Sequence, residues 1–303
     1  MSLSMFLQHF ANALGLGSMY GLIAIGYTMV YGILRLINFA HGDIFMLGAY
    51  FVFFATIQYQ LPWALGLVIA IAGATLCGLL VDRIAYRPLR EAPRISALIS
   101  AIGVSFFIQN ASIVAFTGIP RTVIQPNALV EPLIFGDLST GGVVRLSPLI
   151  IMVPMISFML VGALMWMIYK TKQGLAMRSI SRDIETTRLM GVSVNKTIAL
   201  TFAIGSSLAA VAGIMWALRY PRVEPLMGMT PGFKAFIAAV FGGIGSVPGA
   251  MLGGLFLGFI EIMSVAFFPT LSGYKDVFAF ALLVLVLQFK PTGLMGERLE
   301  DKI

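Results

Sequence analysis

The sequence predicts an all-α fold, a polytopic bundle of about eight or nine transmembrane helices. Hydrophobic residues make up 59% of the 303 residues and charged residues only 11%, whereas charged residues are about a quarter of an ordinary soluble domain. The apolar runs are long and unbroken, unlike the alternating ten-residue strands of a membrane barrel. With so little polar surface, the chain must have the bilayer as its solvent.

Nine apolar segments can be placed as spans. They cover residues 12–34, 43–57, 62–82, 95–117, 148–169, 197–218, 234–247, 249–268 and 276–289. Most approach the ~20 residues that a helix needs to cross a bilayer, but 43–57, 234–247 and 276–289 are shorter. The count is odd only if both short segments around Gly245 cross fully. Residues 1–303 are therefore expected to form a single transmembrane domain.

The positive charge of the chain lies at the ends of these spans. A net charge of +7 would suggest nucleic acid in a soluble protein, but here the positive-inside rule explains it, and the predicted contact is membrane lipid. Alternation of the spans puts fourteen of the 20 Lys and Arg on one side. That side is predicted to be cytoplasmic, with the N-terminus periplasmic and the C-terminus cytoplasmic. The six on the external side are Arg121, Arg145, Arg219, Arg222, Lys234 and Lys275.

Two features in the first third of the chain bear on signal-peptide cleavage and on disulfide formation. Met1–Phe10 has no Lys or Arg, so a cleavable signal peptide is not expected. Cys77 is the only cysteine and lies in an apolar run, which excludes a disulfide within the chain.

Residues 170–196 form a polar interruption that looks built for docking. The segment carries six basic residues, together with Asp183 and Glu185. Asp183 can cap a second short helix with Glu185 in its first turn, and Gly191 can end it. An apolar period at i, i+4 spacing, formed by Ala176, Ile180 and Ile184, predicts a preceding amphipathic helix. We expect two short cytosolic helices that dock a partner; the alternative is a solvated basic loop.

Two further breaks interrupt the apolar pattern. The first, residues 35–43, contains Asn38, His41 and Asp43; the second, residues 241–249, is rich in glycine and contains Gly242, Gly243 and Gly245. Paired breaks in the two halves of a transporter point to the translocation path, because irregular backbone at membrane depth must line a cavity or be buried. The alternative, favoured by their placement near the membrane edge, is a pair of cytosolic turns with Asn38 and Asp43 as helix caps.

Polar side chains inside predicted spans are further candidates for the path. Glu261 lies well inside residues 249–268, where a charge costs roughly 2.5–3.5 kcal/mol. It either lines a pore or bonds another helix, and both interpretations stay open. Gln109 and Asn110 are cheaper polar candidates in the span 95–117.

Small residues four apart predict tight helix packing. The pairs are Gly17 with Gly21, Gly249 with Gly253, and Gly254 with Gly258, and the spacing repeats through Gly205, Ala209 and Gly213. Such notches let helix backbones approach closely in lipid.

The sequence offers no chemistry of its own to drive transport. It has no phosphate-binding loop of the Walker type, and two histidines and one cysteine predict no catalytic, metal or cofactor site. We therefore expect a transporter rather than an enzyme, and one that needs a source of energy outside the chain. A stand-alone channel or facilitator and a secondary carrier that depends on Glu261 are the alternatives.

Four stretches, residues 32–42, 174–191, 199–205 and 241–246, resemble the LivH-type permease subunits of branched-chain amino acid ABC importers. Residues 185–191, Glu-Thr-Thr-Arg-Leu-Met-Gly, resemble the Glu-Ala-Ala-x-x-x-Gly coupling loop of such permeases, with threonines at the alanine positions. The resemblance implies that the ATPase is contacted by residues of this loop, namely Arg178, Asp183, Glu185, Thr186, Arg188 and Gly191.

The same resemblance implies the setting and the partners. These are a bacterial inner membrane, two ATP-binding cassette subunits, a second permease and a periplasmic substrate-binding protein. The expected substrates are leucine, isoleucine and valine, with urea or short amides as the alternative. Whether the second permease is another copy or a related chain stays open.

Overall fold

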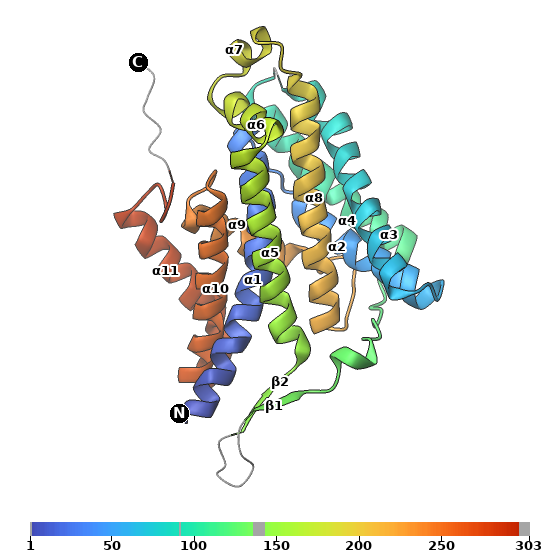
Figure 1. The fold of residues 1–303 in the computed structure, drawn as a ribbon, viewed down its shortest axis with the longest axis vertical. Coiled ribbons are helices and arrows are strands. Elements are labelled where there is room, and N and C mark those ends of the chain that lie inside the picture. The colour runs from blue at the N-terminus through green and yellow to red at the C-terminus, as the bar shows by residue number, and fades with distance from the viewer. Residues whose placement is uncertain (1, 91, 136–142, 297–303) are drawn as a thin grey trace.

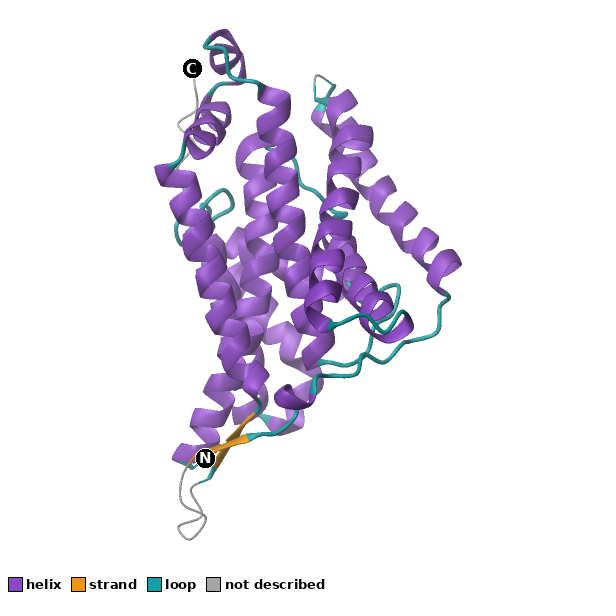
Figure 2. Ribbon diagram, turned by 45° about the vertical axis from the view of Figure 1, so that its right-hand side comes forward, coloured by secondary structure: helices purple, strands orange, loops and turns teal. Residues whose placement is uncertain are grey.

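The computed structural model describes residues 2–90, 92–135 and 143–296, and confirms the helical prediction there (Figures 1 and 2). Short π-helical turns cover Phe54–Gln58 and Asp82–Tyr86. Strands β1 (Leu133–Phe135) and β2 (Val144–Leu146) pair antiparallel, with Leu133 opposite Leu146. The α-helices are α1 (Leu3–Leu34), α2 (His41–Phe53), α3 (Trp63–Val81), α4 (Arg94–Phe116), α5 (Pro148–Lys170), α6 (Lys172–Arg182), α7 (Ile184–Leu189), α8 (Val194–Arg219), α9 (Met229–Gly242), α10 (Val247–Phe267) and α11 (Lys275–Phe289).

Each predicted span coincides with one helix, but two of the helices are short. Among the described residues, seven helical segments are long and apolar enough to cross a membrane. Helix α2, with 13 residues, and α9, with 14, are not among them. The prediction for α9 was displaced toward the C-terminus, because the helix starts at Met229 and ends where Gly243 turns with φ +105°. Two basic residues of the predicted cytoplasmic set, Arg298 and Lys302, lie outside the described residues.

Helix α1 forms the centre of the bundle. Of its most apolar 18-residue window, 94% is buried. It crosses α10 where Gly17 and Gly21 face Gly254 and Gly258; a Cβ atom on Gly17 would lie 2.7 Å from the Cα of Leu255. Since lipid drives apolar helices together only weakly, this close approach is what holds the pair. The prediction of close packing at these glycines is confirmed.

Helix α8 packs in the same way on α2 and α3. A Cβ atom on Gly48 of α2 would lie 2.6 Å from the Cα of Ala210, and Gly78 of α3 fits against the side chain of Ser206. The close packing of small residues between α1 and α10 thus has a counterpart between α8 and α3.

The two halves of the bundle repeat one order, long helix, short helix, long helix, in opposite directions. Helix α1 starts at the end that carries β1 and β2, whereas α8 starts at the end that carries α7 (Figure 1). Each short helix, α2 or α9, follows an irregular segment after the long helix. This is the pattern of an inverted-topology repeat.

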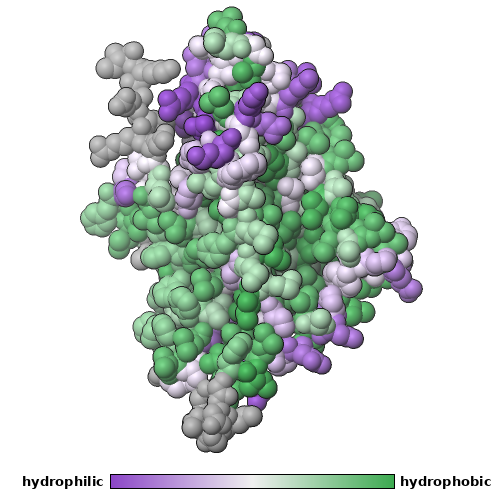
Figure 3. All heavy atoms as spheres, in the orientation of Figure 1, coloured by the Kyte–Doolittle hydropathy of each residue, from purple (hydrophilic) through white to green (hydrophobic). Residues whose placement is uncertain are grey.

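Helices α3, α4, α5 and α11 form the periphery. Only 28%, 22%, 22% and 6% of their apolar windows are buried. Figure 3 shows hydrophobic surface along the sides of the bundle and hydrophilic residues gathered around α6 and α7. The exposed sides therefore suit lipid or other apolar partners, and one end suits water.

Candidate functional site

Helices α6 and α7 form a helical pair at one end of the bundle (Figure 1). Asp183 caps α7, since its Oδ1 accepts the backbone N–H groups of Glu185 at 3.0 Å and Thr186 at 3.1 Å. The Thr186 hydroxyl donates to Asp183 Oδ2 at 2.6 Å. Gly191 ends the unit with φ +82°, which a residue with a Cβ rarely adopts. The predicted cap and terminator are both confirmed.

The predicted apolar period of α6 is only partly right. Met177 and Ile180 are buried under the helix and Ala176 is half-buried. Ile184 is 38% exposed and belongs to α7, because the cap at Asp183 starts a new helix there. The prediction ran one i, i+4 series through the cap at Asp183, and it therefore did not include Met177 among the buried residues of α6.

The outer end of α7 carries exposed apolar and charged side chains side by side. Leu189 is 86% exposed and Met190 is 79% exposed, and the side chains of Glu185 and Arg188 are exposed beside them. We call these four residues the coupling tip. Large apolar side chains on a polar end of a protein mark a docking surface.

The polar side chains of the first break, residues 35–43, bond to other parts of the bundle instead of capping a helix. Asn38 Oδ1 accepts the hydroxyl of Tyr86 at 3.1 Å. The carboxylate of Asp43 accepts Ser105 Oγ at 2.5 Å and Gln109 Nε2 at 3.0 Å, both on α4. Helix α2 begins after Ala40 without a side-chain cap. The alternative in which the side chains of Asn38 and Asp43 act as helix caps is therefore wrong.

His41 packs where the two long helices α1 and α8 meet. Its ring fills the space that a Cβ on Gly26 of α1 would need, and a Cβ on Gly205 of α8 would lie 3.9 Å from the same ring and 3.5 Å from the carbonyl oxygen of Gly26. The ring packs edge-on to Tyr27 with centroids 4.7 Å apart, and the side chain hydrogen-bonds the backbone of Ile23. Nε2 of His41 has no hydrogen-bond partner among the described residues.

The N-terminal turns of α2 and α9 touch inside the bundle. A Cβ atom on Gly42 would lie 2.7 Å from the carbonyl oxygen of Gly228 and 3.3 Å from the Cα of Gly232. These three glycines are needed because only backbone without side chains can approach so closely. The first break is thus joined to the start of α9.

The second break is a tight turn between α9 and α10. Gly243 and Gly245 have φ of +105° and +101°, and Gly242 packs on the backbone of Gly249. Ser246 caps α10 by accepting the N–H of Gly249 at 3.2 Å. This break fits the turn interpretation.

One cavity joins this turn to α6 and α7, which we call the coupling helices. It has a volume of about 870 Å³, and Arg178, Asp183 and Gly245 are among its lining residues. The structure thus brings together residues that were predicted for ATPase coupling and for the translocation path.

Glu261 lies in a buried cluster of charges rather than alone. Its Oε2 accepts Tyr20 Oη at 2.9 Å and Lys234 Nζ at 3.1 Å, and its Oε1 pairs with Lys275 Nζ at 2.8 Å. Lys234 also pairs with Asp276 at 2.6 Å. Lys234 was expected in the external set, but its side chain is 5% exposed inside α9. The cluster joins α1, α9, α10 and α11, which supports the helix-bonding interpretation of Glu261.

The two amides of α4 point in different directions. Gln109 is buried and bonded to Asp43. Asn110 is exposed, and its amide donates to the Phe106 carbonyl of its own helix at 2.7 Å. Asn110 therefore does not join the Asp43 group within this chain.

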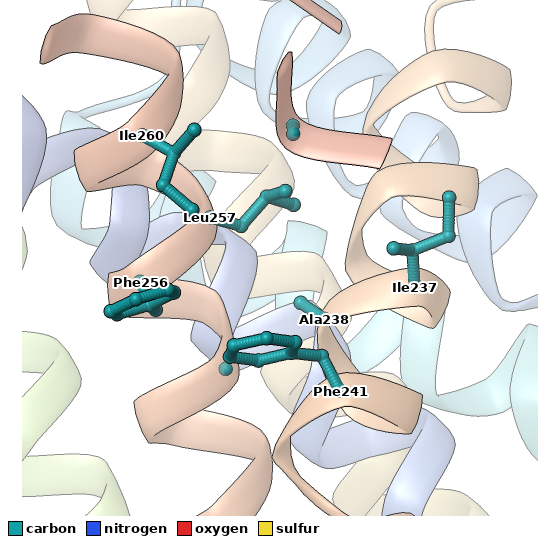
Figure 4. A pocket seen from close by; sticks show the side chains of 8 residues that line it. Ile237, Ala238, Phe241, Phe256, Leu257 and Ile260 are labelled. Carbon is teal, nitrogen blue, oxygen red and sulfur yellow. The ribbon is translucent and has the colours of Figure 1, made fainter. Parts of the chain in front are cut away.

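A second, much smaller space lies between α9, α10 and α11 (Figure 4). Its volume is about 10 Å³, and Phe241 and Phe256 stack beside it with centroids 5.1 Å apart. All its lining residues are apolar or glycine, and the space is too small to hold a substrate.

Several residues of these clusters were missed from the sequence. Tyr20 and Ser105 are ordinary span residues and Tyr86 follows the predicted span 62–82, and no local pattern marks any of them as a partner. Lys234 offered a signal, because a lysine within an apolar run needs a buried partner as much as Glu261 does.

Comparison with known proteins identifies the family. Residues 9–287 match the model for the branched-chain amino acid transport system permease component. The chain is 42% identical over 306 aligned residues to the permease protein BraD of Pseudomonas aeruginosa and to LivH of Escherichia coli K12, both described as high-affinity branched-chain amino acid transport system permease proteins. Each alignment covers 98% of both chains. The ribose import permease RbsC of Haemophilus influenzae is 27% identical over 91% of this chain and 82% of its own. The chain belongs to the family of branched-chain amino acid transport system permease components.

Proposed function

We propose that this chain forms the translocation path for branched-chain amino acids in an ABC importer of the inner membrane, and that its partners supply the energy. The substrate is taken from the names of the relatives that match along nearly the whole chain. Urea or short amides are the alternative within the same family. The proposal treats residues 1–303 as one permease domain.

The observation that carries the coupling role is the coupling tip on α7. Leu189 and Met190 offer an apolar anchor that water disfavours, and Glu185 and Arg188 offer charge beside it. Interfaces gain most of their affinity from a few such buried anchors within a polar rim. An ATP-binding cassette subunit that grips this tip would move α6 and α7 as a unit, because Asp183 and Gly191 fix their geometry.

The end that carries α6 and α7 is proposed to face the cytoplasm. It holds most of the Lys and Arg of the sequence, as the positive-inside rule requires. The opposite end, with β1 and β2, would then face a periplasmic binding protein, and the exposed apolar sides would meet lipid and a second permease.

The path is proposed to run beside the contact between α2 and α9. There His41 and Asp43 lie in the first turn of α2 and are buried in the bundle. The amide of Gln109 donates a hydrogen bond to the Asp43 carboxylate. A switch of access needs an element with two arrangements whose balance ATP binding changes. Two short helices whose N-terminal turns meet through glycines are the best candidates for that element.

The test is uptake of labelled leucine by the complete importer, in parallel with ATPase activity. Replacing Leu189 and Met190 with serine is expected to abolish uptake while the complex keeps its affinity for the binding protein. The matched control replaces Leu3 and Met5 with serine, because this exposed leucine and methionine lie at the start of α1, outside the tip and outside the cavity described above. Competition by urea or acetamide, but not by isoleucine, would contradict the substrate; downhill flux through the isolated chain would contradict the coupled mechanism.

A further inference from the structure

The cavity of about 870 Å³ lies among the ends of several elements. Its walls come from the last turns of α1 and α5, from α6, and from the turn before α10, with Met295 closing one side. The coupling mechanism proposed above does not use this space.

Three arginines line the cavity: Arg35, Arg178 and Arg182. None of them takes part in an ion pair between described residues. Arg178 lies over the ring of Tyr169, with Cζ 5.4 Å from its centroid. Asp183 also lines the cavity, so the three arginines exceed the acids among the lining residues by two. Guanidinium groups gathered in this way bind phosphate oxygens well, because each presents paired N–H donors.

The remainder of the lining is largely apolar. It includes side chains of α1, α5 and α6, namely Met29, Ile33, Met165, Ile168, Leu175 and Met177. A small phosphate would leave this wall unused, whereas a lipid has both a charged head and a hydrocarbon body. Tyr169 adds an aromatic ring at the polar end of α5, as is typical of the membrane interface.

We propose that this cavity binds an anionic phospholipid, with the headgroup phosphate held by Arg35, Arg178 and Arg182 and the upper acyl chains on the apolar wall. Basic pockets between helices at the cytoplasmic face are where such headgroups bind. A lipid seated there would bridge α6 to the turn before α10, and so would stiffen the connection between the coupling helices and the bundle. On the proposed orientation the lipid belongs to the inner leaflet, but the binding itself depends only on the cavity.

The test measures lipid binding directly, without transport. The full chain is placed in phosphatidylcholine nanodiscs that contain a trace of spin-labelled phosphatidylglycerol, and the immobilised fraction is read by EPR. The variant R178Q/R182Q is expected to bind the labelled lipid about fivefold less tightly for each arginine removed, and Arg35→Gln is expected to weaken binding to a similar extent. All three side chains are exposed, so folding should survive, and thermal unfolding of each variant checks this.

The control removes the same amount of charge from α6 and α7 at positions outside the cavity. Lys172 and Arg188 do not line it, so K172Q/R188Q should retain the bound lipid. Equal loss in both double variants would overturn the proposal in favour of general surface charge. Displacement of the label by soluble inorganic phosphate would show a free-anion site instead, and equal retention of labelled phosphatidylcholine would show unspecific lipid contact. Failure of leucine uptake has no bearing on any of these readouts.

Discussion

Replacing Glu261 with leucine should destabilise the bundle, because it leaves a buried ammonium group without one of its two counter-charges. The Glu261 carboxylate contacts Lys234 at 3.1 Å, Lys275 at 2.8 Å and the Tyr20 hydroxyl at 2.9 Å. Removing one partner of a buried ion pair costs about 3–5 kcal/mol. Lys234 keeps Asp276 at 2.6 Å, so we expect the lower value, about 3 kcal/mol.

The partners of Glu261 contribute unequally. The side chain of Lys275 is 44% exposed, so water screens its pair with Glu261, and its loss adds at most about 1 kcal/mol. Lys234 is 5% exposed and carries most of the effect. The double variant Glu261→Leu with Lys234→Leu leaves Lys275 and Asp276 as a neutral pair. It should recover most of the lost stability, since apolar replacement of a whole buried pair is often neutral.

The assay is unfolding of the four proteins of this cycle in the same lipid nanodiscs, followed by tryptophan fluorescence. Single variants that each lose stability, and a double variant that regains it, are the expected pattern. A Glu261→Leu protein as stable as the parent, or a double variant no better than the singles, would refute the reasoning. Leucine uptake by the double variant separates the remaining alternatives, because a proton-carrying Glu261 could not be replaced by leucine at all.

Three further outcomes follow from the geometry. Gly191→Ala, at φ +82°, should cost about 1–2 kcal/mol locally and lower leucine uptake more than ATPase activity in the complete importer. Gly254→Ala should lower the unfolding temperature sharply, because a Cβ there collides with the backbone of α1, whereas Gly103→Ala, with open space around it, should leave that temperature unchanged. Asp43→Leu removes the hydrogen bonds that hold α4 and should increase the mobility of a spin label placed near Gln109. Asp43→Asn can still accept hydrogen bonds, so the label should stay nearly as immobile as in the parent protein.

Features that depend on neighbours in the chain were predictable. The Asp183 cap, the Gly191 terminator and the helical spans follow from hydrogen-bonding groups and hydrophobicity within a few residues. The glycine pairs were also readable, since spacing by four places both residues on one helix face. Even so, the sequence could not say that Gly17 packs on Gly258 and Gly21 on Gly254.

Features that depend on distant pairing were not predictable. Asp43 was expected as a cap because an acid at a helix start normally bonds its own backbone; the hydroxyl of Ser105, 62 residues away, holds it instead. Lys234 was assigned to the exterior because it stood at the outer end of the predicted span 234–247, and its partner 27 residues further on was not recognised. Both errors arise because a buried polar side chain announces a need for a partner but not the identity of that partner.

The two polar clusters have the same place in the two inverted halves. In the first half Asp43 of α2 holds α4 through Gln109, and in the second Lys234 of α9 holds α11 through Asp276. Helices α4 and α11 are otherwise little buried, and lipid gives an apolar helix scarcely any preference for one position. The polar contact therefore sets where each peripheral helix lies. If α2 and α9 shift during transport, each must carry its peripheral helix with it, because the alternative is to leave the Asp43 carboxylate without its donors on α4 and Lys234 with Glu261 as its one remaining counter-charge.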